Sequence, residues 1–456
     1  MAGLFGVSIS PQYKGRFTFS ELLLYGGFYH QHLGEGFGGL AALNNGEISS
    51  DAKPRHIRQN FEDRVRAGEF SGTDGIGYCG DSKEPFDCLS RSGEVAIVFA
   101  GNIINRKELM DYYAGRGRVF ARHHNGDAET MANLIFREQE IVAGIRNATS
   151  QIEGTFAFLM LTKQGIIATV SPDNHWPMVI GEQEGAVAIA SESTCFYNLG
   201  FKYQRDLKPG EIVLLKDGTV TSLGELGPQL VQICKFLWVY TAFPPASICR
   251  VSASLVRGRL GASLARADIE SGFIPDIVSY VPDSGRCHGI GYHNEYCRAV
   301  NLGEIRRVPL LMEVLFKYPF TGRSYPQKTQ GERDREAYLK IVPSSDRFDG
   351  LTLALLEDSV VRGTQIANSL APKLRSMGFK QIHVRASNPE LLSPCPWGKT
   401  TQPGEILALR VPDLKERAKV LGVDSLRYNS IEDLNAAVRE LDPAILCIDC
   451  ALRSKE

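Results

Sequence analysis

The sequence predicts two domains: a layered α+β domain over residues 1–228 and an α/β domain with a parallel sheet over residues 229–456. Three observations support this prediction. The chain has 456 residues, more than one hydrophobic core usually serves. Its first half consists of short apolar runs separated by turn residues, with few long helical patterns. In its second half strand-like and helix-like segments alternate, and the boundary falls near Gly227 and Pro228.

The first domain is expected to contain several strands that end in turns. Residues 93–102 form an apolar run that ends in a glycine turn, and residues 155–161 and 165–170 form two more runs. The short polar link between the last two predicts a β-hairpin. A further strand is expected within residues 207–218. Many strands with few long helices are typical of a layered domain.

The second domain shows the rhythm of a parallel sheet with crossover helices. Strands are predicted within residues 276–285, 351–358 and 381–386, and a helix is predicted over residues 365–377. Ligands of such sheets bind beyond the carboxyl ends of the strands. Because the first two strands both lead into acids and small residues, we expect a ligand site where they end.

Composition excludes several classes of function. Hydrophobic residues make up 43% of the chain and charged residues 23%, and the formal net charge is −1. This balance gives no electrostatic argument for nucleic acid or for an anionic membrane. No apolar run approaches the ~20 residues of a membrane span, and the start lacks the pattern of a secretion signal. We therefore expect a cytoplasmic protein whose ten cysteines are thiols or metal ligands rather than disulfides.

The most informative motif follows the second of these strands. Apolar residues 351–356 lead into Glu357 and Asp358, then into a loop rich in small and hydroxyl residues and the start of a helix. The carboxylates can hold ribose hydroxyls or a hydrated Mg²⁺, and the loop amides with the Ser359 and Thr364 hydroxyls can cradle a phosphate. The alternative is a buried strand followed by an ordinary capped helix, which leaves both acids without a ligand. The candidate substrate-binding residues of this loop are Glu357, Asp358, Ser359, Val360, Val361, Arg362, Gly363 and Thr364.

Two further segments are candidates for the same ligand. Asp283 and Ser284 lie in a run of small residues that could bring backbone amides to a pyrophosphate, although a structural turn explains them equally well. The stretch from residue 318 to residue 340 is polar, basic and rich in turn residues, as a lid over a polyanion should be. Its alternative is a solvated loop. The polar and basic residues of this stretch are Gly322, Arg323, Thr329, Gln330, Arg333 and Lys340.

The run Glu-Asp-Ser-Val-Val-Arg-Gly-Thr at residues 357–364 resembles the signature of type I phosphoribosyltransferases. Its form is the one used by glutamine phosphoribosylpyrophosphate amidotransferases, and the resemblance extends from residue 1 to residue 450. It implies a domain of the N-terminal-nucleophile type, then a phosphoribosyltransferase domain. It also implies phosphoribosylpyrophosphate as the small-molecule substrate, Mg²⁺ held at Glu357 and Asp358, Arg323 and Lys340 over the substrate, a place in purine synthesis, and a homo-oligomer. No nucleic acid or membrane partner is expected.

The C-terminal Cys447 and Cys450 form a C-x-x-C pair, which zinc, iron–sulfur and redox sites share. In the resembled family's cluster-bearing members, four cysteines hold a [4Fe–4S] cluster, and here they match Cys234, Cys395, Cys447 and Cys450. A structural zinc at the same residues and four unrelated thiols are the alternatives. The remaining cysteines are expected to pack as small apolar groups; they are Cys79, Cys88, Cys195, Cys249, Cys287 and Cys297.

The first domain lacks what the resemblance requires for glutamine hydrolysis. The family's N-terminal cysteine nucleophile is replaced by Ala2. The arginine that would hold the glutamine carboxylate falls on Gly80, and the oxyanion-stabilising asparagine falls on Ala100. Asp127 still matches the residue that would bind the substrate amine. We therefore expect a degenerate class II glutaminase domain, retained for architecture, assembly or regulation.

Together these patterns predict a transferase that acts on phosphoribosylpyrophosphate with ammonia or another amine. The alternative is a non-catalytic regulator that binds the same compound, or a partner subunit of an active homologue. This alternative is favoured by Phe243, Pro244 and Pro245, which stand where the resembled family has a charged pair.

Overall fold

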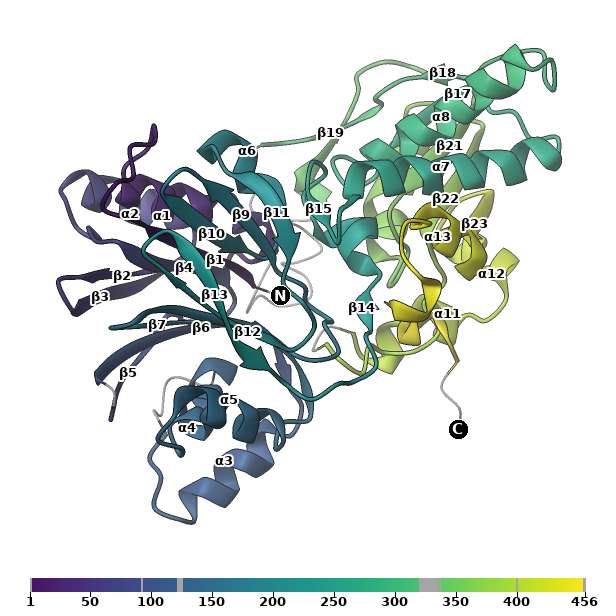
Figure 1. The fold of residues 1–456 in the computed structure, drawn as a ribbon. Helices are drawn as coiled ribbons and strands as arrows, with labels where there is room; N and C mark the ends of the chain where they lie inside the picture. Colours follow the sequence, from purple (N-terminus) through teal and green to yellow (C-terminus); the bar gives the residue numbers. More distant parts are fainter. Residues whose placement is uncertain are drawn as a thin grey trace. The chain divides into compact units, whose positions relative to one another are not determined.

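The computed structural model describes residues 2–91, 93–120, 126–319, 335, 338–398 and 401–453. These residues form two compact units, each with contributions from separate parts of the chain (Figure 1). The first unit contains Met1–Cys234, Ala246–Arg250 and Ala444–Cys447. The second contains Lys235–Pro245, Val251–Pro443 and Ile448–Glu456. Within the described ranges, no helix combines the length and the apolar character that crossing a membrane requires.

The first unit contains two antiparallel sheets. The seven-stranded sheet has the order β11-β9-β10-β1-β4-β2-β3. Its strands are β1 (Gly3–Ile9), β2 (Phe37–Asn44), β3 (Glu47–Pro54), β4 (Asp74–Gly80), β9 (Val179–Gln183), β10 (Ala186–Ala190) and β11 (Lys202–Asp206). The six-stranded sheet has the order β13-β12-β8-β7-β6-β5. Its strands are β5 (Phe86–Ser90), β6 (Gly93–Ile103), β7 (Gly154–Thr162), β8 (Gly165–Val170), β12 (Glu211–Lys216) and β13 (Thr219–Glu225). The predicted hairpin is confirmed, because β7 and β8 pair antiparallel.

Helices and sheets form layers in this unit. Side chains of β1 alternate between two cores, as a strand buried on both faces requires: Leu4 packs between the sheets, and Phe5 packs under α1. The helices on this side are α1 (Phe19–Phe28), begun by a capping box of Thr18 and Glu21, and α2 (Ile57–Arg66). On the other sheet, α4 and α5 cover a third core (Figure 1). The remaining helices are α3 (Arg106–Ala114), α4 (Asp127–Ile135), α5 (Ile141–Thr149) and α6 (Phe196–Leu199).

The second unit is built on a five-stranded parallel sheet with the order β18-β17-β21-β22-β23, which confirms the predicted fold class. Its strands are β17 (Ile277–Tyr280), β18 (Leu310–Leu311), β21 (Thr352–Glu357), β22 (Gln381–Pro389) and β23 (Ser425–Asn429). Both faces are covered. In β21, Ala354 and Leu356 pack in a cluster with α7 (Ala253–Glu270) and α8 (Arg286–Asn301). Leu353 and Leu355 pack on the other face, against Leu370 and Leu374.

The helix after β21 departs from the prediction of one regular helix. Residues Ile366–Leu370 form a π-helical turn, and α10 (Ala371–Ser376) follows it. Pro372 stands at the start of α10. Proline has no N–H to donate to the preceding turn, which explains why the regular hydrogen-bond pattern restarts there.

Shorter elements complete the described chain. A two-stranded antiparallel ribbon joins β19 (Leu315–Lys317) to β20 (Ile341–Pro343), and a parallel pair joins β14 (Ile233–Cys234) to β24 (Leu446–Cys447). The others are β15 (Ser247–Ile248), β16 (Val251–Ser252), α11 (Leu407–Arg410), α12 (Leu414–Val420) and α13 (Ile431–Ala437).

Candidate functional site

Two loops meet at the carboxyl edge of the parallel sheet. β17 and β21 are neighbours, so the loop after Tyr280 lies beside the acids that end β21. The Ser284 hydroxyl donates a hydrogen bond to Glu357 Oε1 at 3.1 Å. A Cβ atom on Gly285 would lie 2.4 Å from the Leu356 carbonyl oxygen, so only glycine allows this approach. The structure therefore brings Ser284 and Glu357, which the sequence singled out separately, into contact.

Both carboxylates at this edge are buried. Glu357 is 7% exposed and Asp358 is 5% exposed. Glu357 Oε1 also accepts the Asp358 N–H at 3.2 Å, and Ser359 donates to Asp358 Oδ1 at 2.6 Å. Burial, and then the neighbouring Asp358 charge, hold the pKa of Glu357 well above its usual range. No cation among the described residues forms an ion pair with either acid. Two buried acids without a cationic partner are expensive to maintain unless a ligand compensates them.

The rest of the acid loop is braced by the segment around α11. The Arg362 guanidinium pairs with Glu405 at 3.0 Å, and Arg410 donates to the Arg362 carbonyl oxygen at 3.0 Å. Gly363 has a φ of 75° and carries the chain into the helix, where Thr364 is exposed at its start. Thr364 thus stands where a helix offers free N–H groups to an anion, whereas Arg362 is engaged with Glu405.

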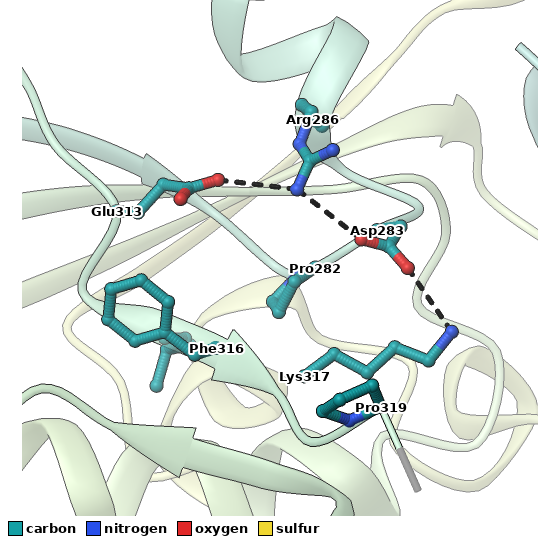
Figure 2. A pocket seen from close by; sticks show the side chains of 8 residues that line it. Pro282, Asp283, Arg286, Glu313, Phe316, Lys317 and Pro319 are labelled. Atoms are coloured by element: carbon teal, nitrogen blue, oxygen red, sulfur yellow. Dashed lines mark hydrogen bonds and ion pairs between the residues drawn. The ribbon is translucent and has the colours of Figure 1, made fainter. Parts of the chain in front are cut away.

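A pocket of about 340 Å³ lies beside the Ser284 loop (Figure 2). Arg286 lies 3.4 Å from both Asp283 Oδ1 and Glu313 Oε1, and Lys317 Nζ lies 3.1 Å from Asp283 Oδ2. Tyr280 donates to Glu313, and burial together with that carboxylate raises the pKa of Tyr280 to about 12. The pocket therefore carries two cations held by two acids. Its lining is Pro282, Asp283, Arg286, Glu313, Leu315, Phe316, Lys317 and Pro319.

Most of the expected basic lid lies outside the described residues. This applies to Gly322, Arg323, Thr329, Gln330 and Arg333. Lys340 is described, in a helical turn of residues 338–340, and its carbonyl oxygen accepts the Tyr318 N–H at 2.9 Å.

In the first unit, three residues that the resemblance aligns with the expected glutaminase site are part of an apolar core. Ala2, Tyr78 and Ala100 belong to one hydrophobic cluster between the two sheets. A Cβ atom on Gly80 would lie 2.1 Å from the Tyr78 hydroxyl oxygen, so Tyr78 occupies the space that a longer side chain at residue 80 would enter. The buried Glu84 accepts the Phe99 N–H at 2.7 Å, next to Ala100.

Asp127 also differs from an open amine-binding carboxylate. It begins α4, is 7% exposed, and its Oδ1 lies 3.6 Å from Arg106 Nε. A cationic side chain of the protein thus stands beside the acid that would receive the ammonium group of an amino acid. Cys79, the thiol nearest in sequence to this region, is fully buried, and burial raises its pKa.

The four matched cysteines are divided between the units. Cys234 and Cys447 are paired residues of the β14–β24 ladder in the first unit. Cys395 and Cys450 belong to the second unit. Burial raises the pKa of both thiols, and the nearby Asp449 charge acts in the same direction. Within each described unit, no three His, Cys, Asp or Glu side chains are grouped so as to hold a metal ion. Thiolates are nevertheless the donors that iron–sulfur clusters take.

Comparisons with known proteins bear on both units. A model of the glutamine amidotransferase domain matches residues 79–198. Amidophosphoribosyltransferase of Methanocaldococcus jannaschii is 28% identical, over 98% of this chain and 96% of the relative. The enzyme of the same name from Bacillus subtilis is 27% identical, over 91% of this chain and 86% of the relative. The solved structure of the B. subtilis glutamine phosphoribosylpyrophosphate amidotransferase, complexed with ADP and GMP, superposes with a TM-score of 0.85 at 26% identity and covers 98% of this chain and 96% of its own.

Over nearly its whole length the chain is therefore similar to amidophosphoribosyltransferases. The likeness covers both units, so the fold is that of an N-terminal-nucleophile-type amidotransferase domain followed by a type I phosphoribosyltransferase domain.

The sequence analysis did not single out three side chains, of which two line the pocket and one lies in the first unit. Glu313 and Lys317 lie on and before a short edge ribbon that no periodic pattern marks, and Tyr78 reads as an ordinary core residue. One signal for Tyr78 was available in the sequence. It stands two residues before Gly80, so both positions lie on the same face of the strand.

Proposed function

We propose that this chain is a transferase that joins ammonia or another small amine to phosphoribosylpyrophosphate, without glutaminase activity of its own. The observation that carries this proposal is the pair of buried acids, Glu357 and Asp358. Neither acid forms an ion pair with a cation among the described residues. They end a strand of a parallel sheet beside a helix start, which is where such sheets bind phosphorylated ligands. We assign this activity to residues 229–456 and a pseudo-glutaminase role to residues 1–228.

Roles follow from position. Glu357 and Asp358 offer hard oxygen ligands, as Mg²⁺ prefers, and one or two carboxylates suffice because this ion keeps waters and phosphate oxygens. The loop from Ser359 to Thr364 would hold the sugar phosphate. Ser284 contacts Glu357, Asp283 precedes it in the same loop, and the pocket cations Arg286 and Lys317 suit the pyrophosphate. Lys340 is assigned to the pyrophosphate by resemblance. Arg323 is assigned by resemblance alone.

In the proposed reaction the amine nitrogen forms a bond to the anomeric carbon as the bond from that carbon to the pyrophosphate oxygen breaks. The pyrophosphate leaves with the electron pair, and the nitrogen gives up a proton. Mg²⁺, when bound, neutralises charge on the leaving pyrophosphate. The protein's contribution is to orient the sugar and to place fixed cations, which requires no covalent residue.

The test is a pyrophosphate-release assay. Purified protein is supplied with phosphoribosylpyrophosphate, Mg²⁺ and ammonium, and then with small amines. We expect release with at least one of them and none from the Asp358→Asn variant. If no amine supports release, the transferase proposal fails.

The loss of glutaminase activity is supported by the apolar cluster at Ala2, Tyr78 and Ala100 and by Arg106 beside Asp127. A methyl group cannot attack an amide carbon, and the position of the oxyanion donor is a methyl group as well. Glutamine should therefore neither support pyrophosphate release in place of ammonium nor be hydrolysed to glutamate. Glutamate release from glutamine at a rate above that of buffer contradicts this part.

A second candidate is a non-catalytic regulator or a partner subunit of an active homologue. It is favoured by Phe243, which is 47% exposed where the family has a charged pair. Calorimetric binding of phosphoribosylpyrophosphate without turnover, or co-purification with an intact homologue, would select this candidate.

We also propose a [4Fe–4S] cluster at Cys234, Cys395, Cys447 and Cys450. It is supported by the adjacency of Cys234 and Cys447 across a strand pair and by the soft donor set.

A further inference from the structure

A buried lysine outside the proposed site holds the base of the β19–β20 ribbon. Lys373 lies in α10 and is 7% exposed. Its ammonium donates to the Ile341 carbonyl oxygen at 2.6 Å, to the Ser369 hydroxyl at 3.1 Å and to the Tyr338 carbonyl oxygen. It also lies 4.0 Å from the centre of the Tyr338 ring. All three of its N–H donors are thus used.

This cation has no carboxylate partner among the described residues. Burial lowers the pKa of Lys373, and two backbone carbonyls with an aromatic face compensate the buried charge instead. An apolar side chain would fill the same space without that electrostatic burden. The ammonium therefore does something that packing alone does not, and what it holds is the backbone on both sides of Lys340.

The ribbon connects Lys373 to the pocket of Figure 2. Ile341 stands opposite Lys317 in the register of β19 and β20. Lys317 lines the pocket and lies 3.1 Å from Asp283 Oδ2. The ribbon has only three residue pairs, and Leu315 and Ile341 are its buried side chains. A two-stranded ribbon of this length does not hold its own position, so its anchors decide where Lys317 and Lys340 stand.

We propose that Lys373 is a positioning residue for the transferase site: by holding the carbonyls of Tyr338 and Ile341, it fixes the ribbon that presents Lys317 and Lys340 to the pyrophosphate of the substrate. The inference rests on the proposed function, because it assigns the ribbon's lysines to a polyanion. Lys373 itself touches no substrate.

The first test is a kinetic split. In Lys373→Met, which keeps most of the length of the side chain, we expect the KM for phosphoribosylpyrophosphate to rise about tenfold, while the KM for ammonium and kcat change less than about threefold. Lys373→Gln keeps N–H donors and should recover part of the affinity. A loss of folded protein would lower kcat without moving either KM, so an unchanged KM in Lys373→Met overturns the proposal. Lys380→Met, at an exposed lysine nearby, is the matched control and should match the wild type.

A double variant tests the route through Lys317. If Lys373 acts by placing Lys317, the KM of Lys317→Met/Lys373→Met should exceed that of Lys317→Met by less than the tenfold expected of Lys373→Met alone. Multiplication of the two single effects would overturn the proposal.

A third measurement separates this inference from the function on which it rests. Hydrogen exchange of residues 338–343 should be at least tenfold faster in Lys373→Met than in wild type or Lys380→Met. Binding of inorganic pyrophosphate with Mg²⁺, followed by calorimetry, should weaken in parallel. If the wild type shows no turnover, the proposed function fails while these two measurements still decide the anchoring. Unchanged exchange and unchanged pyrophosphate binding overturn it.

Discussion

At the scale of single residues, the proposed loss of glutaminase activity predicts that reverting Ala2 alone does not restore glutamine hydrolysis. In Ala2→Cys we expect no glutamate release from glutamine above background. The thiol would enter the apolar cluster of Tyr78 and Ala100, with no oxyanion donor at residue 100, and loss of one such donor typically lowers kcat by about 10²–10³. Gly80→Arg cannot repair the site while the Tyr78 hydroxyl lies 2.1 Å from its Cβ position. Measurable hydrolysis by Ala2→Cys alone would refute this account.

Replacing Glu357 should increase the stability of the protein and decrease its activity. Glu357→Gln keeps the oxygen that accepts from Ser284 and Asp358. It removes a carboxyl that folding must either bury in its charged form or keep protonated above its usual pKa. We expect its free energy of unfolding to rise by ~1–2 kcal/mol and its pyrophosphate release to fall at least ~100-fold. Chemical denaturation and the release assay measure the two. Glu432→Gln, at an exposed acid, is the control and should change neither. A destabilised Glu357→Gln would show that the charge is compensated.

The candidate site was predictable where strand order determines it. The loops that follow neighbouring parallel strands had to meet, and Ser284 of one loop contacts Glu357 at the start of the other. Glu313, Lys317 and Lys373 could not be found in the same way. They reach the region through a short ribbon and a helix whose contacts depend on tertiary packing, and no periodicity in the sequence encodes that packing.

At the scale of elements, α7 and α8 offer a paired test of close helix packing. A Cβ atom on Gly261 would lie 1.9 Å from the His288 carbonyl oxygen, whereas one on Gly258, in the same helix, meets nothing within 4 Å. We expect Gly261→Ala to lower the free energy of unfolding by ~1–3 kcal/mol or more. Gly258→Ala should raise it by ~0.5–1 kcal/mol through helix propensity. Denaturant titration compares them. Equal effects would mean that the helices do not approach so closely.

His288, at the same helix interface, predicts an acid-side loss of stability. Burial, helped by the Arg257 charge, lowers the pKa of His288 to about 3, and its Nε2 lies 3.2 Å from the Val239 carbonyl oxygen. The unfolded chain therefore binds the proton first. Stability from the neutral ring is complete above the unfolded pKa of ~6.5 and is lost as the pH falls toward the folded value. Between pH 7 and pH 5 the wild type should lose ~2 kcal/mol more than His288→Gln. Parallel losses in the two proteins would contradict this.

The helix after β21 marks the limit of local prediction. A helix was predicted over residues 365–377, and a helix is present. The π turn at Ile366–Leu370 depends on Pro372 and on how the turn packs under the sheet, which hydrophobic spacing does not report. Three strands of the parallel sheet, by contrast, were predicted, within residues 276–285, 351–358 and 381–386. Of these, residues 351–356 are apolar except for Thr352, as burial on both faces requires.

At the scale of the whole chain, the first unit includes a segment whose place there no sequence pattern predicted. Leu446 and Cys447 pair with Ile233 and Cys234, more than two hundred residues earlier. Two residue pairs carry no hydrophobic pattern of their own. Such long-range pairing follows from the complete fold, so a boundary read from composition near Gly227 and Pro228 could not include it.

This pairing leads to the last prediction, which concerns iron. If the four matched cysteines share one [4Fe–4S] cluster, protein purified without oxygen should contain about four irons and four sulfides per chain. Burial raises the pKa of Cys395 and Cys450, so binding must displace their protons, and the metal-loaded protein should resist unfolding better than the stripped protein. Cys395→Ser should lose the iron, whereas Cys297→Ser, at a half-buried thiol on α8 outside the set, should retain it. About one zinc per chain with no sulfide would replace the cluster by a zinc site, and metal-free wild type would leave four unrelated thiols.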